Sequence, residues 1–392
     1  MMESKKRLAI ITTHPIQYNA PLFALLKERN LIEFKVFYTW GTDALKEKYD
    51  PGFGKKILWD IDLLKGYDYV FLENIAKDKG SHHFNGIDNP NIIKVIKEYN
   101  PHAILVYGWP LKSHYKVMRY FKGSIPVIFR GDSHLLDHSD FLKSFIKKMV
   151  LKWVYRHVDK AFYVGQSNYQ YYLASGLKPN QLFFAPHAID NQRFSADNNG
   201  IINLGEDLKA SLGITKDDLV FLFAGKLENK KDPFILLNSF IAIAMEKKVH
   251  LVFVGNGEIE SHLKASTKGN KQVHFIDFCN QSEMPAVYQM ADVFVLPSAG
   301  PGESWGLAVN EAMANGKAII VSDKCGCAAT LAKEGVNGFV FQAGNQPMLE
   351  SAIKKMIEDK SLIGKMKIES KRIIADYNFT VIAEAIEAQL IN

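Results

Sequence analysis

The stretch VFVLPSAGPGESWGLAVNEAMA, residues 293–314, indicates the fold of this chain most clearly. A short apolar run typical of a buried strand leads into a loop rich in glycine and proline, and a helix opens near Ser304 to Gly306. Glycines let backbone N–H groups approach a ligand closely, and the first turn of a helix presents N–H donors at the positive end of its dipole. The stretch therefore predicts a strand–loop–helix unit that binds a phosphate group.

Apolar runs of the same kind recur along the chain and alternate with helical stretches. Continuous apolar strands separated by helices indicate parallel sheets covered on both faces. Because one sheet containing all of these strands would be unusual, we expect an α/β fold with two doubly wound, Rossmann-like domains. The expected strands are Arg7–Thr13, Phe34–Tyr38, Tyr69–Glu73, Ala103–Tyr107, Pro126–Arg130, Lys160–Val164 and Gln181–Ala185, then Leu219–Ala224, His250–Gly255, Val273–Phe278, Val293–Pro297, Ala318–Ser322 and Gly338–Phe341.

The domain boundaries follow from breaks in this alternation. Residues 191–207 contain Ser-Ala-Asp-Asn-Asn-Gly and no sustained period. We place the first domain at residues 1–195 and the second at 196–376, and we expect a C-terminal helix at 377–392 to cross back onto the first domain. Ligands of such sheets bind outside the carboxyl ends of the strands, so the expected site is the cleft between the domains.

Composition restricts the class of protein. With 392 residues, 47% hydrophobic and 23% charged, the chain is neither disordered nor a disulfide-stapled miniprotein. Its three cysteines, Cys279, Cys325 and Cys327, are expected to be reduced thiols in a cytoplasmic protein, with the last two packed in the core. We expect no secretion signal and no membrane-spanning segment. Residues 1–195 carry 28 Lys and Arg against 18 Asp and Glu, and residues 196–392 carry 20 against 24, which suggests that the first half meets an anionic partner.

A second segment, residues 223–233, complements the quoted stretch. Its Lys226 and Lys231 follow the first strand of the second domain, where two ammonium groups can face a pyrophosphate and stabilise a departing nucleotide without a metal. Glu303 and Glu311 stand on either side of the predicted helix start and can hold hydroxyl groups of a sugar and of a ribose. A solvated lysine loop and two surface glutamates are the alternative interpretation.

The two segments resemble family 4 of the retaining nucleotide-sugar glycosyltransferases, which have the GT-B fold. The resemblance rests on Glu-x7-Glu at Glu303 and Glu311 and on Gly-Lys-x4-Lys at 225–231, and it covers most of residues 160–345. It implies that Lys226 and Lys231 contact the donor diphosphate, that Glu303 holds the transferred sugar and that Glu311 holds the ribose. The other residues that we expect at the donor are Gly225, Gly255, Gly257, Phe278, Ser304, Trp305, Gly306 and Leu307.

The first domain departs from the family pattern. After its first strand it has residues 13–21, THPIQYNAP, where members often have a Gly-rich loop. Arg130 stands where members often have a histidine, and because arginine is not a base at neutral pH, we expect it to pair with phosphate or a sugar oxygen as a catalytic residue. His14, Asp132 and His134 are the expected acceptor-side residues.

These residues together predict a transferase that moves a sugar from a nucleoside diphosphate to an acceptor hydroxyl, with retention implied by the resemblance. UDP-sugars and cell-surface polysaccharide or glycolipid assembly are expectations from the resemblance, and no metal or other cofactor is expected. Asp60-Ile61-Asp62 lies far from the nucleotide motifs, so we do not assign it a metal. A sugar-nucleotide epimerase and a catalytically silent sugar-nucleotide-binding protein are the alternatives. A nucleic-acid partner is not expected.

Residues Phe141–Arg156 form an expected amphipathic, basic helix. Its apolar stripe is 141/142/145/146/149/150/153/154, and Lys143, Lys147, Lys148 and Lys152 lie off the stripe. A helix that packs on the core with a solvated basic face is one interpretation. Docking on an anionic membrane, at about 1 kcal/mol for each nearby cation, is the other, and it would suit a lipid-linked acceptor and a peripheral location at the inner face of the membrane.

Overall fold

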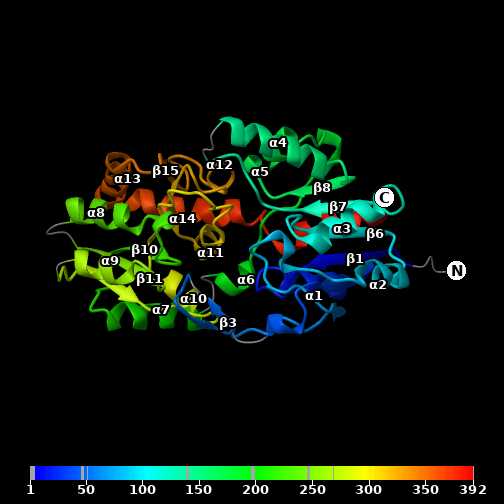
Figure 1. Ribbon diagram of the computed structural model, residues 1–392. Helices are drawn as coiled ribbons and strands as arrows, with labels where there is room; N and C mark the ends of the chain where they lie inside the picture. The colour runs from blue at the N-terminus through cyan, green and yellow to red at the C-terminus, as the bar shows by residue number, and fades with distance from the viewer. Residues whose placement is uncertain are drawn as a thin grey trace.

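A computed structural model describes residues 5–45, 48–50, 52–137, 141–195, 199–244, 248–267 and 269–391. Two separate parallel sheets, one in each half of the chain, form the frame of the molecule (Figure 1). The predicted fold class, two doubly wound α/β domains, is confirmed. The boundary at residues 195 and 196 stays a prediction, since 196–198 lie outside the described residues.

The first sheet has the strand order β5-β2-β1-β6-β7-β8-β9. Its central strands are fully buried because helices cover both faces, which explains the unbroken apolar runs in the sequence. The strands are β1 (Arg7–Thr12), β2 (Glu33–Tyr38), β5 (Tyr69–Phe71), β6 (Ala103–Tyr107), β7 (Val127–Arg130), β8 (Lys160–Tyr163) and β9 (Leu182–Phe184), and the helices are α1 (Ala20–Arg29), α2 (Ile92–Tyr99), α3 (Lys112–Phe121), α4 (Phe141–Tyr155) and α5 (Gln166–Ala174).

The second sheet has the order β12-β11-β10-β13-β14-β15 and the same construction. Its strands are β10 (Leu219–Ala224), β11 (Val249–Val254), β12 (Val273–Ile276), β13 (Val293–Leu296), β14 (Ala318–Ser322) and β15 (Gly338–Phe341). Its helices are α7 (Asn199–Ser211), α8 (Pro233–Ala244), α9 (Glu260–Ser266), α10 (Met284–Gln289), α11 (Leu307–Ala314), α12 (Ala328–Leu331), α13 (Gln346–Glu358) and α14 (Lys360–Ile374), and α6 (Asn191–Phe194) precedes them.

The C-terminal helix α15 (Phe379–Ile391) returns to the first domain, as predicted (Figure 1). Its buried face, with Ile382 and Ile386, joins the apolar core around α1 and β1. The Arg29 guanidinium on α1 donates to both carboxylate oxygens of the buried Glu387, with its Nη2 at 2.8 Å from Oε2. The two domains are therefore joined both by the linker near α6 and by this helix.

One element crosses the cleft in the opposite direction. Strands β3 (Lys48–Asp50) and β4 (Lys55–Ile57) form an antiparallel pair outside both large sheets. The end of this hairpin and the residues that follow it reach the second domain. We call residues 50 and 52–60 the strap. There the Asn280 side chain donates to the Leu58 carbonyl at 2.8 Å, and the Ser282 N–H donates to the Asp60 carboxylate at 3.1 Å. The strap was not among the elements expected from sequence.

Candidate active site

A pocket of about 350 Å³ opens where the carboxyl ends of β10, β11 and β13 face the first domain. Second-domain residues from the predicted donor site line most of it, among them Lys226, Lys231, Glu303 and Glu311. The first domain contributes Gln17, Tyr18, Phe53 and Trp59. The residues that two distant motifs predicted for one ligand therefore share one cavity.

Lys231 and Glu303 form a nearly buried ion pair in this pocket. The Lys231 ammonium lies 2.6 Å from Glu303 Oε2, and the two side chains are 16% and 11% exposed. The Ser298 hydroxyl donates to the same carboxylate oxygen at 2.9 Å. Low solvent exposure strengthens the attraction, so the pair holds a positive and a negative group ready at the carboxyl edge of the sheet.

The loop after β10 that carries Lys226 and Lys231, which we call the lysine loop, packs closely against the loop after β11. A Cβ on Gly255 would lie 2.2 Å from the Gly225 carbonyl oxygen, and a Cβ on Gly257 would lie 2.2 Å from that of Leu227. Only glycine allows the two loops to approach so closely. Gly255 lines the pocket, whereas Gly257 acts on it by supporting the backbone beside Lys226.

The start of α11 also faces the pocket. Gly306, Leu307 and Ala308 line the cavity, and Gly306 has a φ of 99°, in the left-handed region that favours glycine. Because glycine has no side chain to cap the helix, the Leu307 and Ala308 N–H groups can face an anion, whereas the Val309 N–H donates to the Gly306 carbonyl at 2.9 Å. The Trp305 indole points elsewhere, since its Nε1 donates to the buried Asn310 side chain at 2.8 Å. Ser304 turns toward the first domain.

Glu311 lies at the bottom of the pocket between two tyrosines. Its Oε1 accepts from the Tyr18 hydroxyl at 3.0 Å and its Oε2 from the Tyr288 hydroxyl at 2.7 Å. Burial raises the pKa of the Glu311 carboxyl to about 7, against the lowering effect of the two hydrogen bonds. Tyr18 belongs to the loop after β1, so a first-domain hydroxyl occupies the carboxylate expected to hold the ribose.

Lys226 is also held by the first domain. Its ammonium contacts both oxygens of Asp50, at 2.8 and 3.0 Å, and lies 5.0 Å from the centre of the Phe53 ring. Phe53 and Trp59 pack on Phe278, with ring centres 4.9 and 6.3 Å away. The strap therefore covers two residues that sequence predicted at the donor, Lys226 and Phe278.

The structure gives Arg130 a different role from the catalytic one we expected. The buried guanidinium donates to the carbonyl oxygens of Ala185 and Pro186, at 2.7 and 2.8 Å, and Arg130 is not among the residues lining the donor pocket. The arginine ties the end of β7 to the segment after β9. Without the arginine, these two buried carbonyl oxygens would lose the hydrogen bonds that it donates. This need for donors explains why an arginine stands here.

The predicted acceptor-side residues separate. Asp132 lies at the interface, where it accepts from the Ser304 hydroxyl at 2.7 Å and pairs with His187 at 3.5 Å. Buried His134 accepts from the Leu136 N–H through Nδ1 and so donates from Nε2 to the Glu303 carbonyl at 3.0 Å, which makes it a positioning residue. His14 lines a neighbouring cavity of about 410 Å³ with Trp40 and strap residues.

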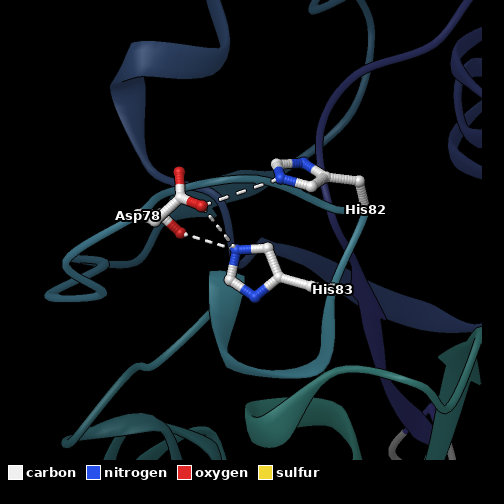
Figure 2. Close-up of side chains that lie close together, drawn as sticks. All are labelled: Asp78, His82 and His83. Carbon is white, nitrogen blue, oxygen red and sulfur yellow. Dashed lines mark hydrogen bonds and ion pairs between the residues drawn. The ribbon is translucent and has the colours of Figure 1, made fainter.

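Two other groups singled out by residue type lie apart from the pocket. Cys325 and Cys327 are buried free thiols in the second-domain core, where burial raises the pKa of Cys325 to about 12. Figure 2 shows His82 and His83 turned toward Asp78 on a surface loop of the first domain, with the His83 Nε2 3.1 Å from the carboxylate. None of these five residues lines the donor pocket.

A family model described as glycosyl transferases group 1 matches residues 205–373. This segment belongs to that family. The match confirms the predicted family 4, GT-B assignment. It contains the lysine loop and the helix α11, so the residues that line the donor side of the pocket are those of the family domain.

Individual proteins that resemble the chain are also named as glycosyltransferases. The chain is 27% identical over 210 residues to an Escherichia coli protein named UDP-Gal:alpha-D-GlcNAc-diphosphoundecaprenol alpha-1,3-galactosyltransferase, covering 51% of each chain. It is 25% identical to the Salmonella typhimurium lipopolysaccharide 1,2-N-acetylglucosaminetransferase, covering 48% of this chain and 52% of that one. The chain thus matches about half the length of these relatives. The crystal structure of Anabaena Alr3699/HepE in complex with UDP and glucose superposes with a TM-score of 0.70 at 16% identity, covering 98% and 99% of the two chains.

Sequence reasoning missed the first-domain residues at the pocket. Tyr18 lies in the loop that replaces the family's Gly-rich segment, and its position after β1 at the carboxyl edge of the sheet was the available signal. Asp50 ends the three-residue strand β3, and Phe53 lies in the turn between β3 and β4, where strands this short show no recognisable period. Tyr288 was not among the predicted site residues, although its hydroxyl donates to Glu311.

Proposed function

We propose that this protein is a retaining, metal-independent glycosyltransferase that uses a nucleoside diphosphate sugar, with UDP-sugars favoured. The observation that carries the proposal is the convergence of Lys226, Lys231 and the start of α11 on one pocket that also holds Glu303 and Glu311. The cations and the helix start suit a diphosphate, and the two carboxylates suit the sugar and ribose hydroxyls on either side of it. This is the arrangement that sugar transfer from a nucleotide requires.

In the proposed step, the acceptor oxygen bonds to the anomeric carbon as the bond from that carbon to the diphosphate oxygen breaks. The electron pair leaves with the diphosphate, whose growing charge is stabilised by both ammonium groups and the α11 amides. The acceptor proton passes to the diphosphate oxygen. Glu303, oriented by Lys231 and Ser298, holds a sugar hydroxyl and keeps the anomeric carbon in place.

The choice of UDP rests on the relatives. The name of the E. coli relative includes UDP-Gal, and the Anabaena crystal structure is a complex with UDP and glucose. A thermal-shift comparison of UDP, GDP and ADP tests the base, because at equal concentration the nucleotide that binds more tightly raises the melting temperature more. We expect the largest shift with UDP, and a larger shift with GDP would contradict the choice.

Incubation with radiolabelled UDP-glucose and UDP-galactose separates the candidate functions. A transferase hydrolyses the donor slowly without an acceptor, an epimerase converts one sugar into the other, and a silent binding protein does neither. We expect slow hydrolysis that Glu303→Ala abolishes and that Glu358→Ala, at an exposed glutamate of α13, leaves unchanged. Interconverted sugars would establish the epimerase instead.

We further propose a lipid-linked acceptor and attachment to the inner face of the cell membrane through α4. The structure describes the side chains of this helix from residue 145 onward. Of the predicted stripe, Phe145, Ile146, Met149, Val150 and Trp153 are 44–56% exposed, whereas Val154 is buried in the core. Exposed lysines lie beside the stripe, namely Lys147, Lys148 and Lys152. An apolar stripe in solvent flanked by lysines favours the membrane interpretation over a helix that buries this stripe.

The same helix borders a cavity near the interface. Lys147 and Val150 line a cavity of about 490 Å³ together with Trp109 and Asp132. An acceptor headgroup entering from a membrane at α4 would therefore pass toward the Ser304 side of the donor site. Among the described residues, no helix combines the length and apolarity needed to cross a bilayer.

Vesicle binding tests the α4 proposal. We expect the protein to pellet with phosphatidylglycerol vesicles at low salt and to be released at high salt or by Ile146→Ser. Ile368→Ser is the matched control, since Ile368 is 69% exposed in the second domain. Equal pelleting of both variants, or none for the natural chain, would contradict the proposal.

A further inference from the structure

Three residues expected at the donor each touch the first domain in the structure. Lys226 contacts the Asp50 carboxylate, Glu311 accepts from the Tyr18 hydroxyl, and Phe278 packs on Phe53. In each case the partner has the chemistry of the ligand part that the residue is expected to bind. The Asp50 carboxylate contacts the lysine expected to bind the diphosphate, and the Tyr18 hydroxyl contacts the glutamate expected to hold the ribose. The Phe53 ring packs on the aromatic residue expected at the donor.

We propose that Asp50 and Tyr18 occupy the phosphate and ribose contacts of the donor site, and that a nucleoside diphosphate binds by displacing them. This inference rests on the proposed donor site and adds two competing groups from the opposite domain. A phosphate oxygen replaces the Asp50 carboxylate on Lys226, and a ribose hydroxyl replaces the Tyr18 hydroxyl on Glu311.

The geometry favours exchange over simultaneous contact. Asp50 uses both oxygens on Lys226, which lines the pocket with Tyr18, so an incoming phosphate meets an ammonium group already paired. Glu311 accepts one hydroxyl on each oxygen, and the Tyr288 hydroxyl comes from its own domain. The exchangeable donor is therefore Tyr18, which reaches Glu311 from the opposite domain.

The two contacts differ in strength. The Lys226 and Asp50 side chains are each 31% exposed, so their pair competes weakly with a phosphate. The Tyr18 hydroxyl donates to a Glu311 carboxyl group that is 4% exposed, and a hydrogen bond shielded from water in this way is electrostatically stronger. Removing Tyr18 as a competitor should therefore improve donor binding more than removing the Asp50 charge.

Two conservative variants test the exchange. Asp50→Asn removes the charge but keeps an acceptor for the Gly52 and Phe53 N–H groups that form the turn. Tyr18→Phe removes only the hydroxyl. Isothermal titration calorimetry with UDP should show binding tightened about threefold by Asp50→Asn and about tenfold by Tyr18→Phe. With uridine, which lacks phosphate, only Tyr18→Phe should tighten binding.

Asp60→Asn is the matched control, because it removes an equal charge from the strap but contacts Ser282 instead of a donor-binding residue. We expect it to change UDP binding less than twofold, and thermal unfolding confirms that each variant is folded. Weaker or unchanged UDP binding by Asp50→Asn and Tyr18→Phe, or equal tightening by Asp60→Asn, overturns the exchange alone. If UDP binds neither the natural chain nor the variants, the proposed donor site fails as well.

Discussion

The two walls of the donor pocket come from different domains, and their ion pairs differ in solvent exposure and in whether they cross the cleft. The second-domain wall pairs Lys231 with Glu303 inside one domain, with little solvent exposure. The first-domain wall reaches Lys226 through Asp50 across the cleft, with a third of each side chain exposed. One wall is preorganised, and the other depends on how the domains meet. We therefore expect chemistry to depend most on the first and donor access most on the second.

Removing Lys231 should have the largest effect. Lys231→Ala takes one cation from the leaving diphosphate and leaves Glu303 without its partner, so we expect sugar transfer to fall about 100- to 1000-fold. Measured donor turnover checks this, with Lys354→Ala on exposed α13 as the control. Activity within tenfold of the natural chain would remove the basis for treating the second-domain wall as the catalytic one.

Glu311 should make the stability of the protein depend on pH. Its pKa is raised from 4.5 to about 7 by burial, and the groups around it are Tyr18, Tyr288 and the more distant Arg193. Folding then favours the neutral carboxyl. The contribution of Glu311 to the free energy of unfolding is therefore full below about pH 4.5 and is lost as the pH rises through 7. The loss is roughly 3 kcal/mol.

Glu311→Gln removes this ionisation. Relative to the variant, the natural chain should lose stability in urea unfolding between pH 4.5 and 7.5. Parallel pH profiles for the two proteins would show that the carboxyl is not held in a desolvated environment.

In the first domain, Arg130 should affect the stability of the protein more than its activity. Arg130→Met leaves the carbonyls of Ala185 and Pro186 without donors, so we expect a loss of about 2 kcal/mol in the free energy of unfolding. Donor hydrolysis measured well below the melting temperature should stay within about threefold of the natural rate. A loss of hydrolysis in a protein of unchanged stability would restore the catalytic role predicted from sequence.

Lys226 should show the smallest effect on stability. Because its pair with Asp50 is partly exposed, Lys226→Ala should cost less than about 1 kcal/mol in unfolding experiments, well below the cost of Lys231→Ala. An equal cost for the two alanine variants would mean that the walls do not differ as described.

The same contrast explains what the sequence could predict. The second-domain site follows from short-range patterns: an apolar strand, a glycine loop and a helix start place Glu303 and Glu311 within one segment. The expected strands also agree with the structure to within a few residues, as in β5, expected at Tyr69–Glu73 and found at Tyr69–Phe71. Burial on both faces makes such strands apolar throughout and easy to recognise.

The first-domain wall could not be predicted in this way. Asp50 meets Lys226 across 176 positions of sequence, in a hairpin too short for a period to appear. Arg130 was placed by analogy with a family histidine, but the sequence near it does not reveal that Ala185 and Pro186 need its donors. Contacts that exist only after two domains meet leave no local pattern.

A crystal structure of the protein with UDP tests the proposed donor site. We expect diphosphate density between Lys226, Lys231 and the first turn of α11, with a ribose hydroxyl on Glu311. Density for the nucleotide outside this pocket, or a diphosphate that neither lysine contacts, would contradict it.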